Sequence, residues 1–103
     1  MKIKLLYFAG CPGWKKTDSN IKELLASTKH EYSKLDVNTE KTLHESFYGS
    51  PTIVYEDKGK WRDVFGLKGD SIMACRPYHH GGKMTPNIPK EMLKQKLKKL
   101  KII

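Results

Sequence analysis

The sequence has 103 residues, of which 38% are hydrophobic and 30% are charged, and it carries a formal net charge of +9. This length supports one domain with its own core and is too short for two, and the composition excludes a disordered chain. No apolar run approaches the roughly 20 residues of a membrane span, and the first residues lack the basic segment, long apolar run and cleavage site of a signal peptide. We therefore expect a single domain over residues 1–103, located in the cytoplasm, with no membrane partner.

The first predicted elements are a strand and a helix joined by a turn. Residues 2–8 (KIKLLYF) are apolar and aromatic, which is typical of a buried strand, and the breaker residues GCPG follow at 10–13. Pro12 fits the first position of a helix, where its missing N–H costs nothing, and we expect this helix to reach about Thr28. Apolar residues recur along it at helical spacing, beside an aromatic one: Ile21, Leu24, Leu25 and Trp14.

A second strand, a short helix and a third strand are predicted next. Residues 30–37 (HEYSKLDV) fit a strand, and residues 39–47 (TEKTLHESF) fit a helix. Residues 48–57 (YGSPTIVYED) place β-branched and aromatic residues directly after Pro51. Since proline cannot donate to a sheet ladder, we expect Pro51 at the first position of this strand.

The last part of the chain predicts a connection, a strand, a loop and a helix. Residues 56–70 are polar and interrupted by glycine, so we interpret them as a long connection. Residues 71–80 (SIMACRPYHH) alternate well enough for a final strand, residues 81–87 form a loop, and residues 89–101 form the final helix. The predicted order is β-α-β-α-β-β-α. Two aromatic residues are expected to anchor the long connection: Trp61 and Phe65.

The positive charge is scattered, with one dense run in residues 90–103 (KEMLKQKLKKLKII). Three leucines recur there at helical spacing: Leu93, Leu97 and Leu100. They predict a buried stripe that leaves the lysines on the solvent side of the helix and near its C-terminus, where positive charge is favoured. No aromatic-interleaved basic motif and no recognition-helix pattern accompanies the run, so we expect no nucleic-acid partner.

Three short motifs point to a family. They are AGCPGW at 9–14, GSPT at 49–52 and CRPY at 75–78. In this order, the chain resembles small bacterial and archaeal proteins of the thioredoxin-like superfamily that carry a GCPxW turn, a GSPT segment and a later CRxY. The resemblance covers nearly the whole chain. It implies an α/β fold with a central four-stranded mixed sheet flanked by helices.

The resemblance also implies roles for residues at the first turn. Cys11 holds the position of the nucleophile, and Pro51 that of a cis-proline that lies against the active-site turn. The second thiol of a C-x-x-C motif falls at position 14, which is Trp14 in this sequence. The usual adjacent resolving cysteine is therefore absent. The residues expected to contact substrate are Pro12, Trp14, Ser50, Pro51 and Thr52.

The surroundings of Cys11 favour a reactive thiol. The thiolate is the nucleophilic form, and the free N–H groups and the dipole at a helix start stabilise it. Lys15 and Lys16 add positive charge nearby. Cys11 should therefore be a stronger acid than a free thiol. The alternative is a small buried side chain that fills space at a turn.

Cys75, which lies 64 positions after Cys11, is either a remote resolving cysteine or a buried, inert strand residue. In the thioredoxin arrangement the third and fourth strands are antiparallel, which carries the end of the last strand back towards Pro51 and Cys11. Two cysteines are too few for a structural disulfide framework, so a bond between them would indicate redox activity. Arg76 and Tyr78 are expected at the surface.

Two other uses of the cysteines stay open. Together with His79 and His80 they offer ligands for zinc or a soft metal, but the spacing is not that of a known site, and adjacent strand residues point to opposite faces. Some members of the family are related to organomercurial lyases, which also use two distant cysteines. The supporting aspartate of that enzyme has no counterpart here, since the nearest acid is Asp18. We expect no bound metal and no cofactor.

The sequence thus predicts a thiol–disulfide oxidoreductase or a redox-responsive thiol protein. Cys11 is the nucleophile, Cys75 is the candidate resolving cysteine, and Pro51 shapes the docking edge. The expected partner is a thiol or disulfide of a protein or a small molecule, and the chain is expected to act as a monomer. The alternatives are a non-catalytic binding module of the same fold and a soft-metal-binding thiol protein.

Overall fold

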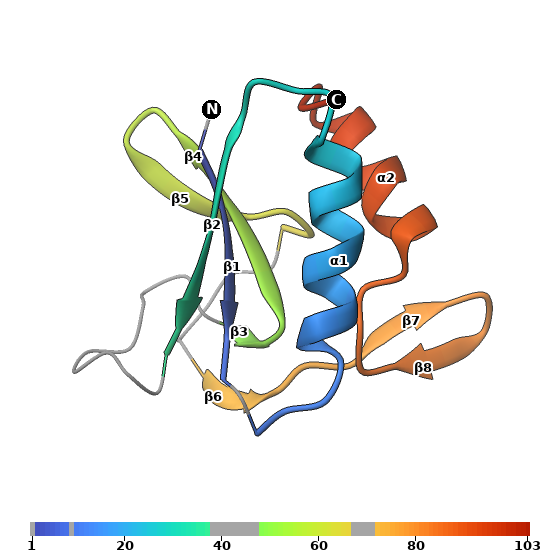
Figure 1. Ribbon diagram of the computed structural model, residues 1–103. Helices are drawn as coiled ribbons and strands as arrows, with labels where there is room; N and C mark the ends of the chain where they lie inside the picture. Colours follow the sequence, from blue (N-terminus) through green and yellow to red (C-terminus); the bar gives the residue numbers. More distant parts are fainter. Residues whose placement is uncertain (1, 9, 38–47, 67–71) are drawn as a thin grey trace.

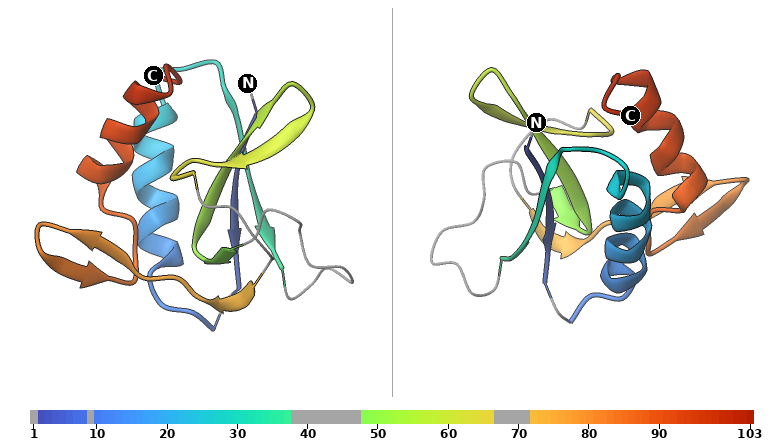
Figure 2. Two further views of the ribbon diagram at one scale, coloured as in Figure 1. Left: turned by 180° about the vertical axis from the view of Figure 1, so that it is seen from behind. Right: turned by 45° about the horizontal axis from the view of Figure 1, so that its top comes forward.

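The computed structural model describes residues 2–8, 10–37, 48–66 and 72–103 (Figure 1). It is a mixed α/β structure in which two helices lie side by side on one face of a four-stranded sheet (Figures 1 and 2). The elements in chain order are β1 (Lys2–Tyr7), α1 (Trp14–Leu25), β2 (Glu31–Asp36), β3 (Tyr48–Ser50), β4 (Thr52–Asp57), β5 (Lys60–Asp63), β6 (Ile72–Cys75), β7 (Tyr78–His80), β8 (Lys83–Thr85) and α2 (Lys90–Lys99). Neither described helix is long and apolar enough to cross a membrane.

The central sheet has the strand order β2-β1-β4-β5. β1 runs parallel to β2 and antiparallel to β4, and β4 runs antiparallel to β5. Parallel neighbours need a crossover connection, which α1 supplies between β1 and β2. Successive strand residues point to opposite faces, so Ile3 and Leu5 of β1 face the helices while Leu6 faces the other side. The α/β class and the mixed four-stranded sheet agree with the prediction.

The main core lies between the sheet and the two helices. Its buried members come from every layer: Ile3, Leu5, Ile21, Leu25, Ile53, Val64, Tyr78, Ile88, Leu93, Leu97 and Ile102. A smaller cluster of Leu6, Val37 and Val54 covers the opposite face of the sheet. Phe65 packs against the main core and Trp61 against the smaller cluster, so both anchor their segment as expected.

α1 begins later than the sequence predicts, because Gly13 is its N-cap. Gly13 has a φ angle of 93°, which favours glycine, and a Cβ atom at this position would overlap the carbonyl oxygen of Pro86. Pro12 therefore lies in the turn before the cap and not at the first helical position. The Thr17 hydroxyl accepts a hydrogen bond from the N–H of Ile88 at 2.9 Å, which holds the same distant segment against α1.

The leucine stripe of α2 follows the prediction. Leu93 and Leu97 are fully buried, and Leu100, the C-cap residue, packs against the edge of the core. The helix lysines are exposed, apart from the half-buried Lys96. Three basic residues lie in the last turn, where the helix dipole favours positive charge. The expected solvated lysine face is confirmed.

The interpretation of residues 56–70 as a connection is wrong in its first part. The chain turns at Lys58 and Gly59, whose φ angles are 52° and 80°, and returns as β5, the fourth strand of the central sheet. Two successive residues with positive φ are typical of a two-residue hairpin turn whose twist matches that of the strands. The Lys58-Gly59 pair is thus a hairpin signal and not the mark of a long loop.

The prediction of one final strand at 71–80 is also wrong. The chain forms two short strands, β6 and β7, with Arg76 and Pro77 between them, because proline cannot donate to a ladder. β6 pairs in parallel with β3, while β7 forms an antiparallel hairpin with β8. β8 lies within residues 81–87, which were predicted to form a loop. These strands belong to two small sheets and not to the central one.

Two further predictions concern the segment before the third strand. Pro51 does not begin that strand but lies between β3 and β4, which belong to different sheets. The helix predicted at 39–47 lies outside the described residues. Pro51 therefore marks the point where the chain leaves the small β3–β6 sheet and enters the central sheet.

Candidate functional site

Cys11 lies in the turn between β1 and α1, three residues before Trp14, the first helical residue. Its N–H donates to the carbonyl oxygen of Phe8 at 3.1 Å, and the residue is only 2% exposed. Cys11 is disulfide-bonded, and its Sγ lies 3.4 Å from the carbonyl oxygen of Ser50. A disulfide sulfur has no proton to donate, so this approach becomes a hydrogen bond only when Cys11 is a thiol.

The backbone of Cys75 reaches the same place from β6. Cys75 is the last residue of β6, and its backbone lies opposite Ser50 in the parallel pair with β3. The next residue, Arg76, donates its N–H to the carbonyl oxygen of Ser50 at 2.8 Å. Cys11 Sγ and the backbone of Cys75 therefore both lie next to Ser50. Cys75 does so through the β3–β6 pair, and not through antiparallel strands of the central sheet as expected.

The segment at Ser50 and Pro51 is held by its own side chains. The Ser50–Pro51 peptide bond is cis, as the resemblance implied, and Ser50, Pro51 and Thr52 are all buried. Ser50 Oγ accepts the N–H of Phe8 at 3.3 Å, and the Thr52 hydroxyl donates to the carbonyl oxygen of Gly49. The hydroxyls of Ser50 and Thr52 therefore fix the loop from inside and offer no exposed group to a substrate.

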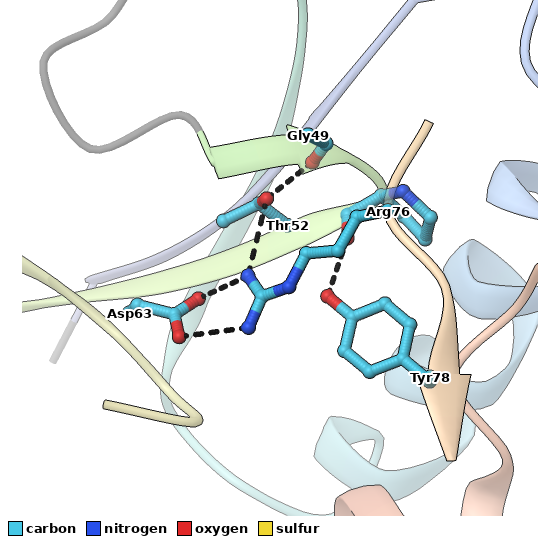
Figure 3. Close-up of polar contacts among 6 residues, drawn as sticks. Gly49, Thr52, Asp63, Arg76 and Tyr78 are labelled. Carbon is cyan, nitrogen blue, oxygen red and sulfur yellow. Dashed lines mark hydrogen bonds and ion pairs between the residues drawn. The ribbon is translucent and has the colours of Figure 1, made fainter. Parts of the chain in front are cut away.

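Arg76 makes a buried ion pair that the sequence analysis missed. Its guanidinium contacts Asp63 through two N···O distances of 2.8 and 3.1 Å and approaches Thr52 Oγ1 at 3.4 Å (Figure 3). The side chains of Arg76 and Asp63 are 11% and 0% exposed, so the expectation of a surface Arg76 is wrong. A charge at this depth needs a charged partner, and a bidentate carboxylate provides one. The ion pair ties the segment after Cys75 to the end of β5.

Tyr78 is likewise buried and not at the surface. Its hydroxyl donates to the carbonyl oxygen of Pro51 at 2.5 Å (Figure 3), and the guanidinium carbon of Arg76 lies 4.9 Å from its ring centroid. Burial raises the pKa of Tyr78 above its ordinary value, so the hydroxyl keeps its proton and remains a donor. Arg76 and Tyr78 together fasten the chain that follows β6 onto the loop between β3 and β4.

One local signal could have identified the ion pair. Asp63 ends the stretch KWRD, in which alternation places Asp63 on the same face as Trp61. An aspartate on the buried face of a strand requires a partner. This signal can be used only when residues 60–63 are known to form a strand. The burial of its partner, Arg76, is not predicted, because a single alternating strand over residues 71–80 would place Arg76 at the surface.

A stacked aromatic pair borders the Cys11 turn. The rings of Tyr7 and Trp14 have centroids 4.1 Å apart and planes inclined by 18°. An open hollow of about 270 Å³ is lined by residues 10–15, and Pro12 is exposed there. Pro12 and Trp14 are therefore accessible to a molecule that approaches the turn. Two lysine ammonium groups lie near the Trp14 ring centroid, Lys15 at 5.8 Å and Lys34 at 5.9 Å.

The nearest acid to the turn, Asp18, is occupied by partners of its own. The Tyr32 hydroxyl donates to Asp18 Oδ1 at 2.7 Å, while the ammonium groups of Lys34 and Lys22 lie 3.2 and 3.3 Å from Oδ2. Burial raises the pKa of Asp18, but these hydrogen bonds outweigh it and hold the pKa below its usual value. Burial and the bond to Asp18 raise the pKa of Tyr32. Asp18 thus serves the packing of α1 on β2.

Acidification is expected to destabilise the protein through Asp18. The pKa of Asp18 is lower in the folded state than in the unfolded state. The ionised carboxylate therefore adds to the free energy of unfolding above the unfolded-state pKa of about 3.9, and this stabilisation is lost as the pH falls through the folded-state pKa. Urea unfolding of the wild type and of Asp18→Asn, from neutral pH to about pH 2.5, measures this. The difference between their stabilities should shrink towards acid, and a constant difference would contradict the expectation.

The metal-binding alternatives need several His, Cys, Asp or Glu side chains close together. In residues 2–8, 10–37, 48–66 and 72–103, no group of three or more His, Cys, Asp or Glu side chains could hold a metal ion. His79, one of the two histidines considered as ligands, is exposed on β7. The described residues therefore provide no set of three ligands for a metal ion.

Comparisons with known proteins return no match for this chain. No protein-family model, no curated protein and no solved structure matches it. The class of the protein therefore depends on its own fold and site. That site is a disulfide-bonded cysteine at a strand-to-helix turn, packed against the loop between β3 and β4.

Proposed function

We propose that this chain is a thioredoxin-like thiol–disulfide oxidoreductase, or a redox-responsive thiol protein, in which Cys11 cycles between disulfide and thiol. The observation that carries the proposal is the disulfide at Cys11, just before α1 and beside Ser50. The strand order β2-β1-β4-β5, with α1 crossing over between the parallel strands, supports a thioredoxin-like fold. Because a fold alone does not specify an activity, the functional argument depends on the cysteine.

The proposed partner of Cys11 in this disulfide is Cys75. The chain has two cysteines, and none of the described cysteines is a free thiol. The backbone of Cys75 lies opposite Ser50, whose carbonyl oxygen is 3.4 Å from Cys11 Sγ. Both observations support an intrachain bond that joins the first turn to the end of β6.

The reaction starts when a substrate thiolate attacks Cys11 Sγ. The Cys11–Cys75 bond breaks, Cys75 leaves as a thiolate that takes up a proton, and a mixed disulfide forms at Cys11. A second substrate thiolate then attacks the substrate sulfur of this mixed disulfide, and Cys11 leaves in turn. The substrate is oxidised to a disulfide, and its two electrons reside on the two cysteines. Of the two protons that the substrate thiols lose, Cys75 takes up one and the other passes to water while Cys11 remains a thiolate. Free N–H groups at the start of α1 stabilise the negative charge that develops on Cys11.

A glutathione redox series, read by mass and free-thiol count, tests the proposal. In the wild type both thiols are expected to be consumed together, within one chain and at one potential. Cys75→Ser is expected to take up one glutathione at Cys11, and Cys11→Ser is expected to lose exchange. Exchange that survives in Cys11→Ser, or two free thiols throughout the series, would contradict the proposal.

The burial of Cys11, which is 2% exposed, favours one alternative: a binding module in which the disulfide is purely structural. The same glutathione redox series distinguishes this binding module from an oxidoreductase. Structural disulfides have reduction potentials below about −300 mV and resist reduction by glutathione. A bond that stays intact across the series assigns the chain to this alternative, whereas reduction at a higher potential assigns it to the oxidoreductases.

A further inference from the structure

A shallow apolar groove adjoins the proposed redox site. We name it the Met84 groove; its volume is about 260 Å³, and it is lined by Arg76, Pro77, Met84, Thr85 and Pro86. Met84 is 63% exposed, and the other exposed large hydrophobic residue of the described chain, Ile103, is only 37% exposed. A methionine this exposed gains little from packing within its own chain, so its flexible thioether side chain is available for a contact with another molecule.

The polar groups of the lining are directed to partners within the protein. The Arg76 guanidinium is bound to Asp63, and the Thr85 hydroxyl donates to the carbonyl oxygen of Asn87 at 2.6 Å. Two of the five lining residues are prolines, which have no N–H to offer. The groove therefore presents mainly carbon atoms and a thioether sulfur.

Two of the residues that line the groove lie close to the two cysteine positions. Arg76 directly follows Cys75, and Pro86 lies so close to Gly13 that a Cβ atom on this glycine would overlap its carbonyl oxygen. Gly13 is two residues after Cys11. Figure 1 shows the β7–β8 hairpin beside the N-terminal end of α1. A chain segment lying in the groove would thus pass next to the Cys11 turn.

The sequence segments that form the turn and the groove carry basic but no acidic side chains. Residues 10–17 and 76–90, which form the turn and the groove, contain no Asp or Glu. Among their basic residues, Arg76 is bound to Asp63 and Lys90 to Glu23. The remaining three lysines of these segments are exposed: Lys15, Lys16 and Lys83. This surface therefore attracts a partner that carries acidic side chains.

We propose that the Met84 groove docks an extended segment of a protein substrate, with an apolar side chain in the groove and acidic side chains facing the three exposed lysines. The proposal rests on the proposed function, since docking there brings a substrate cysteine to Cys11. The flexible thioether of Met84 accommodates apolar side chains of different shapes. The small size of the groove suits a transient complex, as a reaction with turnover requires.

The test compares exchange rates for a peptide and for a small disulfide. The peptide carries one cysteine as a mixed disulfide with thionitrobenzoate, a nearby leucine and two glutamates. In the reduced protein, the Cys11 thiolate attacks the peptide sulfur and releases thionitrobenzoate, whose absorbance reports the rate. Cys75 then displaces the peptide thiol and re-forms the Cys11–Cys75 bond. The symmetrical disulfide of thionitrobenzoate is the small reference.

Met84→Ser is expected to lower the ratio of the peptide rate to the small-disulfide rate about tenfold, because the groove loses its longest apolar side chain. Replacing the peptide leucine by serine should lower the wild-type ratio by a similar factor. Replacing the two glutamates by lysines should lower it as well, with a smaller effect at high salt. Ile103→Ser is the matched control, and its ratio should equal that of the wild type.

An unchanged ratio in Met84→Ser overturns the docking proposal and leaves the proposed redox function intact. If the wild type reacts with neither disulfide, the redox function fails, and docking is decided separately. For that, a fluorescent peptide with serine in place of cysteine is titrated by anisotropy: weaker binding to Met84→Ser supports docking, and equal binding overturns it. A wild-type dimer that Met84→Ser dissociates also overturns the proposal, since a second copy then covers the groove.

Discussion

Reducing the disulfide at Cys11 is expected to lower the free energy of unfolding by about 4 kcal/mol. The proposed Cys11–Cys75 bond joins positions 64 residues apart, and a bond across a loop of this length removes much of the conformational freedom of the unfolded chain. The loss is large, because domains are stabilised by only about 5 to 15 kcal/mol in total. The reduced protein should therefore unfold at a clearly lower denaturant concentration than the oxidised protein.

Guanidinium unfolding with and without a phosphine reductant measures this difference. The double variant Cys11→Ser/Cys75→Ser is the matched control, since it should have the stability of the reduced wild type and show no response to the reductant. If the wild type unfolds at the same midpoint in both conditions, the predicted stabilisation is wrong. The pairing of the two cysteines would then need direct mapping by mass spectrometry.

Replacing Asp63 by asparagine is expected to destabilise the protein by about 3 kcal/mol. The substitution keeps the shape of the side chain but removes the carboxylate from the Arg76 guanidinium, whose side chain is only 11% exposed. A buried charge that loses its ionic partner costs far more than a broken surface pair. The effect should extend to the candidate site, because the Arg76 N–H is bound to the carbonyl oxygen of Ser50.

Asp57→Asn is the matched control for this substitution. Asp57 contacts Arg62 at 3.2 Å, but the two side chains are 41% and 48% exposed, so its loss should cost no more than about 1 kcal/mol. The double variant Asp63→Asn/Arg76→Met removes the buried charge as well and should regain part of the lost stability. Equal losses for the two aspartates in chemical denaturation would show that burial does not set the cost of the ion pair.

The first strand and the first helix were predictable because their signals are local. The apolar run at 2–8, the breakers at 10–13 and the helical spacing of Ile21 and Leu25 depend only on neighbouring residues. The start of α1 was misplaced because it depends on Pro86, a residue from the other end of the chain that approaches Gly13. Local sequence patterns do not indicate such a long-range contact.

Local sequence patterns are enough to predict the two described helices, the buried leucine stripe of α2 and the placement of Cys11 at a strand-to-helix turn. The folded chain is needed to show that β5 completes the central sheet, that Asp63 contacts Arg76, and that the Cys11 turn and the end of β6 meet at Ser50. Periodicity reports which face of an element is buried, but it does not report which distant segment covers that face. Chain segments far apart in sequence find their partners through burial, hydrogen bonding and charge pairing in the folded state, and these interactions bring the candidate site together.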